Sequence, residues 1–207
     1  MAWYARTTLS SEKIKIALIR AYVDIDDLID ADHVMEREGL PNLGELVYPS
    51  VEKVIKKVRI GFRDIVYDLK SGAGKLPICM YLKAHVRKTV GVEPSETYFT
   101  EARKARKVIQ TNGLINGYRR LEYVNEDPLQ VDLSDATVIL MCSPYFLETP
   151  MQAFADKFLT LKPGLRIITL QKLPEHPRLK LVKILDLATS WADSLPFYYY
   201  KLLPSKQ

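Results

Sequence analysis

A glycine-rich turn and an acidic residue, each placed directly after a short apolar run, constrain this chain most. The turn reads D-L-K-S-G-A-G at residues 68–74 and follows the run 64–67. The acidic residue, Glu93, ends the next run and lies 19 residues after Gly74, close to the spacing of a strand–helix–strand unit. Small residues let the backbone approach a ligand, and a carboxylate accepts hydrogen bonds from both ribose hydroxyls. The pair predicts an α/β sheet that binds a nucleoside.

The residues around the glycines separate three classes of ligand. A dinucleotide site has a third glycine where this chain has Pro77. A phosphate-binding P-loop has Ser or Thr after Gly-Lys, and this chain has Leu76 there. The turn that remains is D/E-x-G-x-G-x-G, typical of class I methyltransferases that use S-adenosylmethionine (SAM).

Three residues of this chain match the methyltransferase turn and one departs from it. Asp68, Gly72 and Gly74 stand at the expected positions, whereas Lys70 replaces the first glycine. The sequence therefore predicts SAM as the cofactor, with one cationic side chain inside the binding turn.

Composition narrows the class of protein. The chain has 207 residues, 47% of them hydrophobic and 27% charged, which suits a globular domain with a real core. Its net charge of +5 is a mild basic bias. Cys79 and Cys142 give no disulfide framework, and no metal-binding spacing of His and Cys occurs. Without an apolar leader or an apolar run of membrane-spanning length, we expect a soluble intracellular protein that binds no metal.

The rest of the chain alternates between strand-like and helix-like segments. We divide it into a helical N-terminal extension, 1–43, and a methyltransferase domain, 44–207. In the domain we expect a Rossmann-like, mostly parallel seven-stranded sheet with helices on both faces, made mixed by a closing hairpin. The expected strands are 65–69, 89–92, 121–124, 137–142, 166–170, 181–187 and 197–203, and the expected helices are 49–59, 76–85, 95–111 and 149–161.

The predicted extension contains two features. Ser10 or Ser11 is expected to cap a helix whose apolar residues include Ile16 and Ile19. The segment 24–38 then carries seven acidic residues and one arginine. It is either a guide for a basic protein substrate or a solvated helix face, and the second interpretation is favoured.

Ligands of open α/β sheets lie beyond the carboxyl ends of the strands, so the candidate site residues follow the strands. After the first strand we expect Ser71, Gly72 and Gly74 to hold the cofactor. Glu93 follows the second strand and is expected to bind the ribose. Asp127 follows the third and either binds the adenine amino group or caps a turn.

The segment after the fourth strand lies where methyl transfer is expected. It contains Cys142, Ser143, Tyr145 and Phe146. The two rings either line a pocket that desolvates an amine or pack beneath the following helix, and the sequence leaves both open.

These motifs resemble those of the non-SET histone lysine methyltransferases of the disruptor-of-telomeric-silencing type, over roughly residues 42–203. Residues 68–74 resemble that family's D-L-G-S-G-x-G, residues 91–93 its G-V-E, and residues 126–127 its G-D. Residues 138–146 are similar to its V-I-F-V-N-N-F-x-F, with Cys142 and Ser143 in place of the two asparagines. A looser resemblance is to the small lysine methyltransferases that modify an ATP synthase subunit.

The resemblance implies roles for further residues. Glu45, in a match to the family's Y-G-E loop, would contact the methionine end of SAM, and Asp127 would contact the adenine. Tyr198, with Tyr199 and the Ser-Trp pair at 190–191, would help form a lysine channel. The implied substrate is a lysine-bearing protein, with a basic protein as one candidate, and no nucleic acid is required.

Two other functions stay open at this stage. Residues 143–145 faintly resemble the S-P-P-Y motif of amino-group DNA methyltransferases, which leaves a small molecule or a nucleic acid as the acceptor. Lys70 in the glycine motif leaves a third possibility, a SAM-fold binding module without catalysis.

Overall fold

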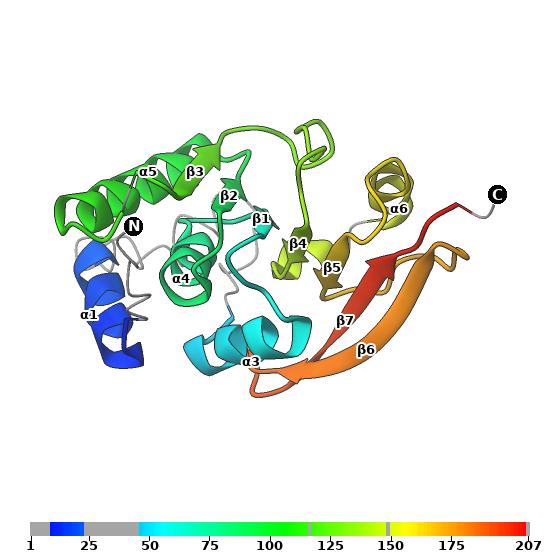
Figure 1. The fold of residues 1–207 in the computed structure, drawn as a ribbon, viewed down its shortest axis with the longest axis horizontal. Helices are drawn as coiled ribbons and strands as arrows, with labels where there is room; N and C mark the ends of the chain where they lie inside the picture. The colour runs from blue at the N-terminus through cyan, green and yellow to red at the C-terminus, as the bar shows by residue number, and fades with distance from the viewer. Residues whose placement is uncertain (1–8, 23–45, 116, 148–149, 206–207) are drawn as a thin grey trace, which may run out of the picture.

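The computed structural model describes residues 9–22, 46–115, 117–147 and 150–205. A seven-stranded sheet with the order β3-β2-β1-β4-β5-β7-β6 runs through them (Figure 1). Strands β1 to β5 are parallel, and β7 is antiparallel to both of its neighbours, which confirms the predicted mixed sheet. The strands are β1 (Ile65–Leu69), β2 (Lys88–Val92), β3 (Arg120–Val124), β4 (Val138–Met141), β5 (Arg166–Thr169), β6 (Leu179–Leu187) and β7 (Leu195–Leu202).

Helices flank this sheet, as the alternating pattern predicted. They are α1 (Ser11–Tyr22), α3 (Tyr48–Val58), α4 (Lys75–Ala84), α5 (Glu96–Thr111) and α6 (Gln152–Leu159), with a 3-10 helix at Pro144–Leu147. Across the described ranges, every helix is too short or too polar to cross a bilayer.

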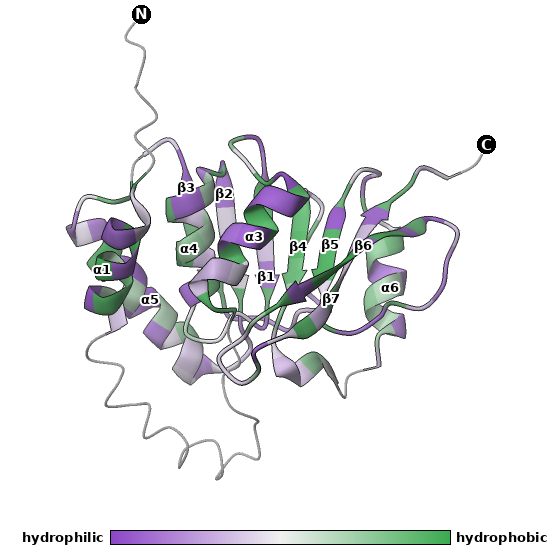
Figure 2. Ribbon diagram, turned by 90° about the horizontal axis from the view of Figure 1, so that it is seen from below, coloured by the Kyte–Doolittle hydropathy of each residue, from purple (hydrophilic) through white to green (hydrophobic). Residues whose placement is uncertain are grey.

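Alternate side chains of the central strands pack into different cores on the two faces of the sheet. On one face Tyr67 and Ile139 belong to a cluster that includes Phe154 and Phe158 of α6. On the other face Val66 and its neighbours pack against α3 and α4. Strand β4 is buried along its whole length and carries the hydrophobic colour in Figure 2. This double burial explains its uninterrupted apolar sequence.

The first helix begins as predicted, but only part of its predicted apolar set faces the core. The Ser10 Oγ accepts a hydrogen bond from the backbone N–H of Lys13 at 3.3 Å, which caps α1. Ile16 and Ile19 were expected on the apolar face, but they are 44% and 65% exposed. The buried face carries the predicted Ile14 and Tyr22 together with Ala17, and α1 packs against α4 and α5.

The helix expected over 149–161 is shorter than predicted. It begins at Gln152, and the 3-10 helix precedes it. The carboxyl end of β4 is therefore followed by a tight 3-10 turn rather than by a long loop.

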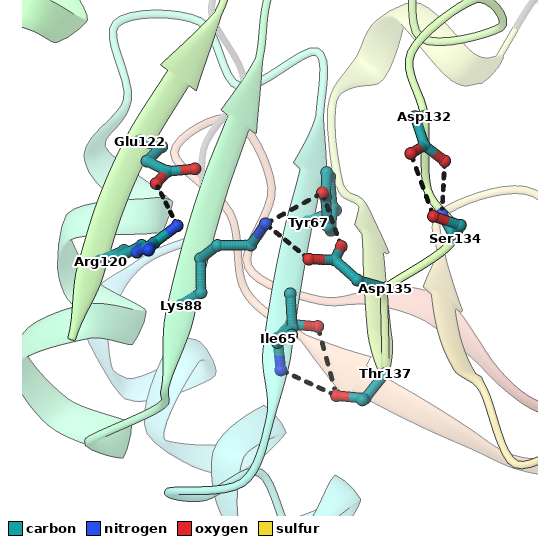
Figure 3. A network of polar contacts seen from close by, with 9 residues as sticks. All are labelled: Ile65, Tyr67, Lys88, Arg120, Glu122, Asp132, Ser134, Asp135 and Thr137. Carbon is teal, nitrogen blue, oxygen red and sulfur yellow. Dashed lines mark hydrogen bonds and ion pairs between the residues drawn. The ribbon is translucent and has the colours of Figure 1, made fainter. Parts of the chain in front are cut away.

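Charged side chains at the amino ends of the central strands pair with one another. Asp64 accepts hydrogen bonds from Gly61 N–H and the Thr137 hydroxyl, both at 2.8 Å, and pairs with the Arg166 guanidinium. Nearby, the Lys88 ammonium lies 2.7 Å from the Asp135 carboxylate (Figure 3). These ion pairs lie at the amino ends of the strands, opposite the end that carries the glycine-rich turn.

Candidate functional site

The glycine-rich turn follows β1 and brings the backbone against a tyrosine. Gly74 has a φ of +84°, in the left-handed region that favours glycine. A Cβ added at Gly74 would lie 2.5 Å from the Tyr123 ring, and one at Gly91 would lie 2.6 Å from the same ring. Both glycines are therefore needed for the Tyr123 ring of β3 to pack against β2 and the turn.

Tyr123 organises the turn, and the sequence analysis missed it. Its hydroxyl donates a hydrogen bond to the carbonyl oxygen of Gly74 at 2.7 Å. Burial raises the pKa of this phenol well above its usual value, and the nearby Asp68 charge adds to the shift. The hydroxyl thus stays protonated and keeps donating. Tyr123 lies in a short edge strand, 49 residues from Gly74, and nothing in the sequence around it predicts this contact.

Glu93 lies at the turn, as the spacing of the two motifs predicted. Its carboxylate accepts hydrogen bonds from Gly72 N–H at 2.9 Å and from Ser95 N–H at 3.0 Å. The Asn125 amide donates to the Glu93 carbonyl oxygen at 2.9 Å and holds the loop after β2. The glutamate is 4% exposed, so it is a buried carboxylate supported mainly by backbone donors.

Ser71 adds an unusual polar group to this site. Its backbone N–H donates to the Val92 carbonyl at 3.0 Å, which fixes the turn against β2. Its side-chain hydroxyl is buried and finds no hydrogen-bond partner among the described residues. Buried hydroxyls without a partner are rare in folded proteins, so this one stands out among the groups of the turn.

Lys70 reaches across the same site. It adopts a φ of +60°, an uncommon conformation for a residue with a Cβ. Its ammonium lies 4.0 Å from the nearer carboxylate oxygen of Glu93 and 4.2 Å from the centre of the Tyr145 ring. The side chain therefore joins the loop after β2 to the loop after β4.

Asp68 and Cys142 lie deeper at the carboxyl ends of β1 and β4. Both are buried, at 5% and 3% exposed. Burial raises the pKa of the Cys142 thiol well above its usual value, and the Asp68 charge raises it further. The thiol is therefore a neutral group and not a nucleophile.

The two rings after β4 have different surroundings. Tyr145 is 41% exposed, and its backbone N–H donates to the Ser143 hydroxyl at 3.3 Å. Phe146 is fully buried, and its ring packs edge-on against Phe154 at 5.4 Å between centroids. Core packing accounts for Phe146, so Tyr145 is the ring of this pair that faces the site.

Asp127 is an exposed turn residue. Its Oδ1 accepts a hydrogen bond from Leu129 N–H at 2.7 Å, which is the turn-capping arrangement considered from the sequence. Only one carboxylate oxygen is used in this way by the described residues, which leaves the other as an acceptor for a ligand.

Tyr198 lies on β7 opposite Thr169, the last residue of β5, and is partly buried. This position is level with the carboxyl ends of the central strands. Thr189, next to the predicted Ser-Trp pair, bridges to Leu46, so the start of the predicted domain lies against the end of β6. Glu45 and the acidic segment 24–38 lie outside the described residues.

A cavity of about 740 Å³ lies elsewhere, between α5 and β3. Its walls carry Arg103, Arg106 and Lys107. The Arg106 guanidinium donates to the Leu121 carbonyl oxygen at 2.6 Å, so it covers the open edge of the sheet. Within the described ranges, no group of three His, Cys, Asp or Glu side chains converges to hold a metal ion.

The chain matches a known family over most of its length. Residues 41–189 match the DOT1 family of histone methylation proteins. A protein-lysine N-methyltransferase of Saccharolobus islandicus is 33% identical over 127 residues, which are 58% of this chain and 73% of the relative.

Solved structures share the fold at low sequence identity. The candidate methyltransferase yhhF of Escherichia coli has a TM-score of 0.57 at 12% identity, covering 76% of this chain and 87% of its own. A candidate SAM-dependent methyltransferase of Methanococcus maripaludis has a TM-score of 0.54 at 15% identity, covering 77% and 86%. At such identities the likeness establishes the fold alone.

The strand order and the glycine-rich turn define a class I methyltransferase, whose methyl donor is SAM. Within that class, the chain belongs to the DOT1 family, because the match spans more than half of its residues. The predicted family, fold and cofactor are thereby confirmed.

Proposed function

We propose that this methyltransferase modifies the side-chain amine of a lysine in a protein. The observation that carries the proposal is the contact between the Lys70 ammonium and the Tyr145 ring, at 4.2 Å. A ring face that attracts a lysine ammonium at the end of β4 can also attract the ammonium of an acceptor lysine before that lysine loses its proton. The description of the Saccharolobus islandicus relative supports the same acceptor.

Several residues of the turn fit SAM. The unpartnered Ser71 hydroxyl supplies a hydrogen-bonding group, and the left-handed Gly72 and Gly74 let the backbone approach the ligand. A carboxylate offers about four acceptor positions. Two positions on Glu93 are taken by backbone N–H groups, which leaves acceptors for the two ribose hydroxyls. In this proposal Asp127 binds the adenine amino group and Glu45 contacts the methionine end.

When bound, SAM supplies a methyl group on a positively charged sulfur, which is already activated for transfer. The acceptor amine must be neutral, because only its free electron pair forms the new C–N bond while the C–S bond breaks. Tyr145 and Tyr198 wall the acceptor side and exclude water, which lowers the pKa of an amine by desolvation. The buried, protonated Cys142 and the neighbouring Ser143 line the base of this site and hold the loop in place.

Labelled SAM tests the acceptor. The full chain is incubated with methyl-labelled SAM and, separately, with a basic protein mixture, with RNA and with DNA. We expect label on lysine residues, located by mass spectrometry, and a loss of at least tenfold in Tyr145→Leu. Tyr118→Leu, which changes a ring that is 86% exposed, is the matched control and retains activity. Label on nucleic acid instead of protein would replace lysine as the acceptor.

A further inference from the structure

The side chain of Lys70 lies within the proposed cofactor site. The side chain of Lys70 is only 16% exposed and that of Glu93 only 5%. The ammonium thus lies inside the site, between the carboxylate proposed to bind ribose and the ring proposed to face the acceptor. A cation held by a buried carboxylate and an aromatic face is attracted from two sides.

We propose that Lys70 is an internal competitor of the cofactor, and that its ammonium occupies the Glu93 carboxylate until SAM displaces it. We call its contacts with Glu93 and Tyr145 the Lys70 latch. The proposal rests on the proposed cofactor placement at Glu93, but it does not depend on the acceptor being lysine. Because the ribose hydroxyls and the ammonium need the same carboxylate, both cannot bind it fully at once.

The latch lowers the apparent affinity for the cofactor. If only a fraction of molecules has the lysine withdrawn, the measured dissociation constant rises by the inverse of that fraction. The displaced ammonium remains tethered at the turn, near the positive sulfur of SAM. The product S-adenosylhomocysteine has a neutral sulfur, so the latch disfavours SAM more than the product.

The latch also links the two halves of the site. Lys70 gives up the Tyr145 ring when it leaves Glu93, because one side chain makes both contacts. Cofactor binding therefore frees the ring for the acceptor. The acceptor surface becomes available only after the methyl donor has entered, which predicts an ordered reaction.

Calorimetric titration of the full chain tests the latch. Lys70→Met removes the charge at similar length, and Lys70→Gly also removes the strained left-handed side chain. We expect both to bind SAM about tenfold more tightly, equivalent to about 1.4 kcal/mol, with a smaller gain for S-adenosylhomocysteine. Lys180→Met, at an exposed position of β6, is the control for net charge and leaves affinity unchanged. Unchanged or weaker SAM binding by both Lys70 variants would overturn the latch.

A third ligand separates the latch from a direct contact with the methionine carboxylate of SAM. Methylthioadenosine lacks that carboxylate, and the latch predicts that Lys70→Met binds it more tightly as well. If Lys70→Met instead loses affinity for SAM and S-adenosylhomocysteine but not for methylthioadenosine, Lys70 is a carboxylate ligand and the latch is wrong.

Two further variants separate the latch from the cofactor placement. Tyr145→Leu is expected to tighten SAM binding in the native chain but not in Lys70→Met, because the ring acts through Lys70. Glu93→Ala in the Lys70→Gly background is expected to weaken SAM binding. If Glu93→Ala has no effect there, the placement of the cofactor fails. If it weakens binding while the Lys70 variants change nothing, only the latch fails.

Discussion

The polar side chains at the two ends of the central strands differ in how fully they are paired within the chain. At the amino end, Asp64 has three partners within the chain, and Lys88 is paired with Asp135 (Figure 3). At the carboxyl end, the Ser71 hydroxyl has no partner among the described residues, and Lys70 reaches Glu93 only at 4.0 Å. The first arrangement stabilises the fold. The second keeps polar groups available for a ligand, which fits the rule that parallel sheets bind at their carboxyl edge.

Asp64→Ala should have the largest effect and act on stability alone. It removes the carboxylate partner of the mostly buried Arg166 guanidinium, which keeps only backbone carbonyl acceptors, and it leaves the Gly61 N–H without its acceptor. We expect the free energy of unfolding in denaturant to fall by about 3 kcal/mol. Asp193→Ala, at an exposed position, should stay within about 0.5 kcal/mol of the native value. A comparable loss in cofactor affinity of the folded variant would show that the two ends are not independent.

Glu93→Ala should act mainly on binding. We expect it to cost about 1–3 kcal/mol of SAM binding, the scale of a hydrogen bond to a charged group. In the native chain, Glu93→Ala also removes the contact that holds Lys70 in the site, which partly offsets the loss of SAM affinity. We therefore expect the full loss only in the Lys70→Gly background. Titration calorimetry measures both, and an effect near zero in each would exclude the ribose contact.

Tyr123→Phe should have an intermediate effect on both stability and SAM binding. The variant keeps the ring that fills the space beside the two glycines but loses the hydrogen bond to the Gly74 carbonyl. We expect about 1 kcal/mol less stability and a few-fold weaker SAM binding. Equal stability in thermal unfolding would mean that ring packing alone holds the turn.

Cys142→Ala should have the smallest effect on catalysis, because the thiol is protonated and supplies no nucleophile. Its pKa is raised in the folded chain, so the unfolded chain loses this proton first as the pH rises. Ionisation of this thiol therefore lowers the free energy of unfolding only above its ordinary pKa of 9.0. It has no effect at neutral pH. Alkylation at pH 8 should be slow in the folded chain and fast in denaturant. Rapid labelling of folded protein at Cys142 would contradict this assignment.

Much of the fold was predictable from local pattern. All seven strands lie within two residues of their predicted bounds, since each is a short apolar run flanked by turn residues. The face of α1 was not predictable in the same way. Ile14 is buried, but Ile16 and Ile19, which look equally like core residues, are exposed where α1 packs onto α4 and α5. Which face is buried depends on the shape of the neighbours.

The sequence by itself determined the class of the protein: the strand and helix order, the glycine-rich turn, and the placement of Glu93 beside it. These follow from spacing along the chain, which local periodicity and backbone preferences control. Only the tertiary structure decided that Tyr123 packs on Gly74 and Gly91, and that Lys70 joins Glu93 to Tyr145. Those contacts join segments far apart in the sequence. Their energies depend on distance and burial, which exist only once the sheet has formed.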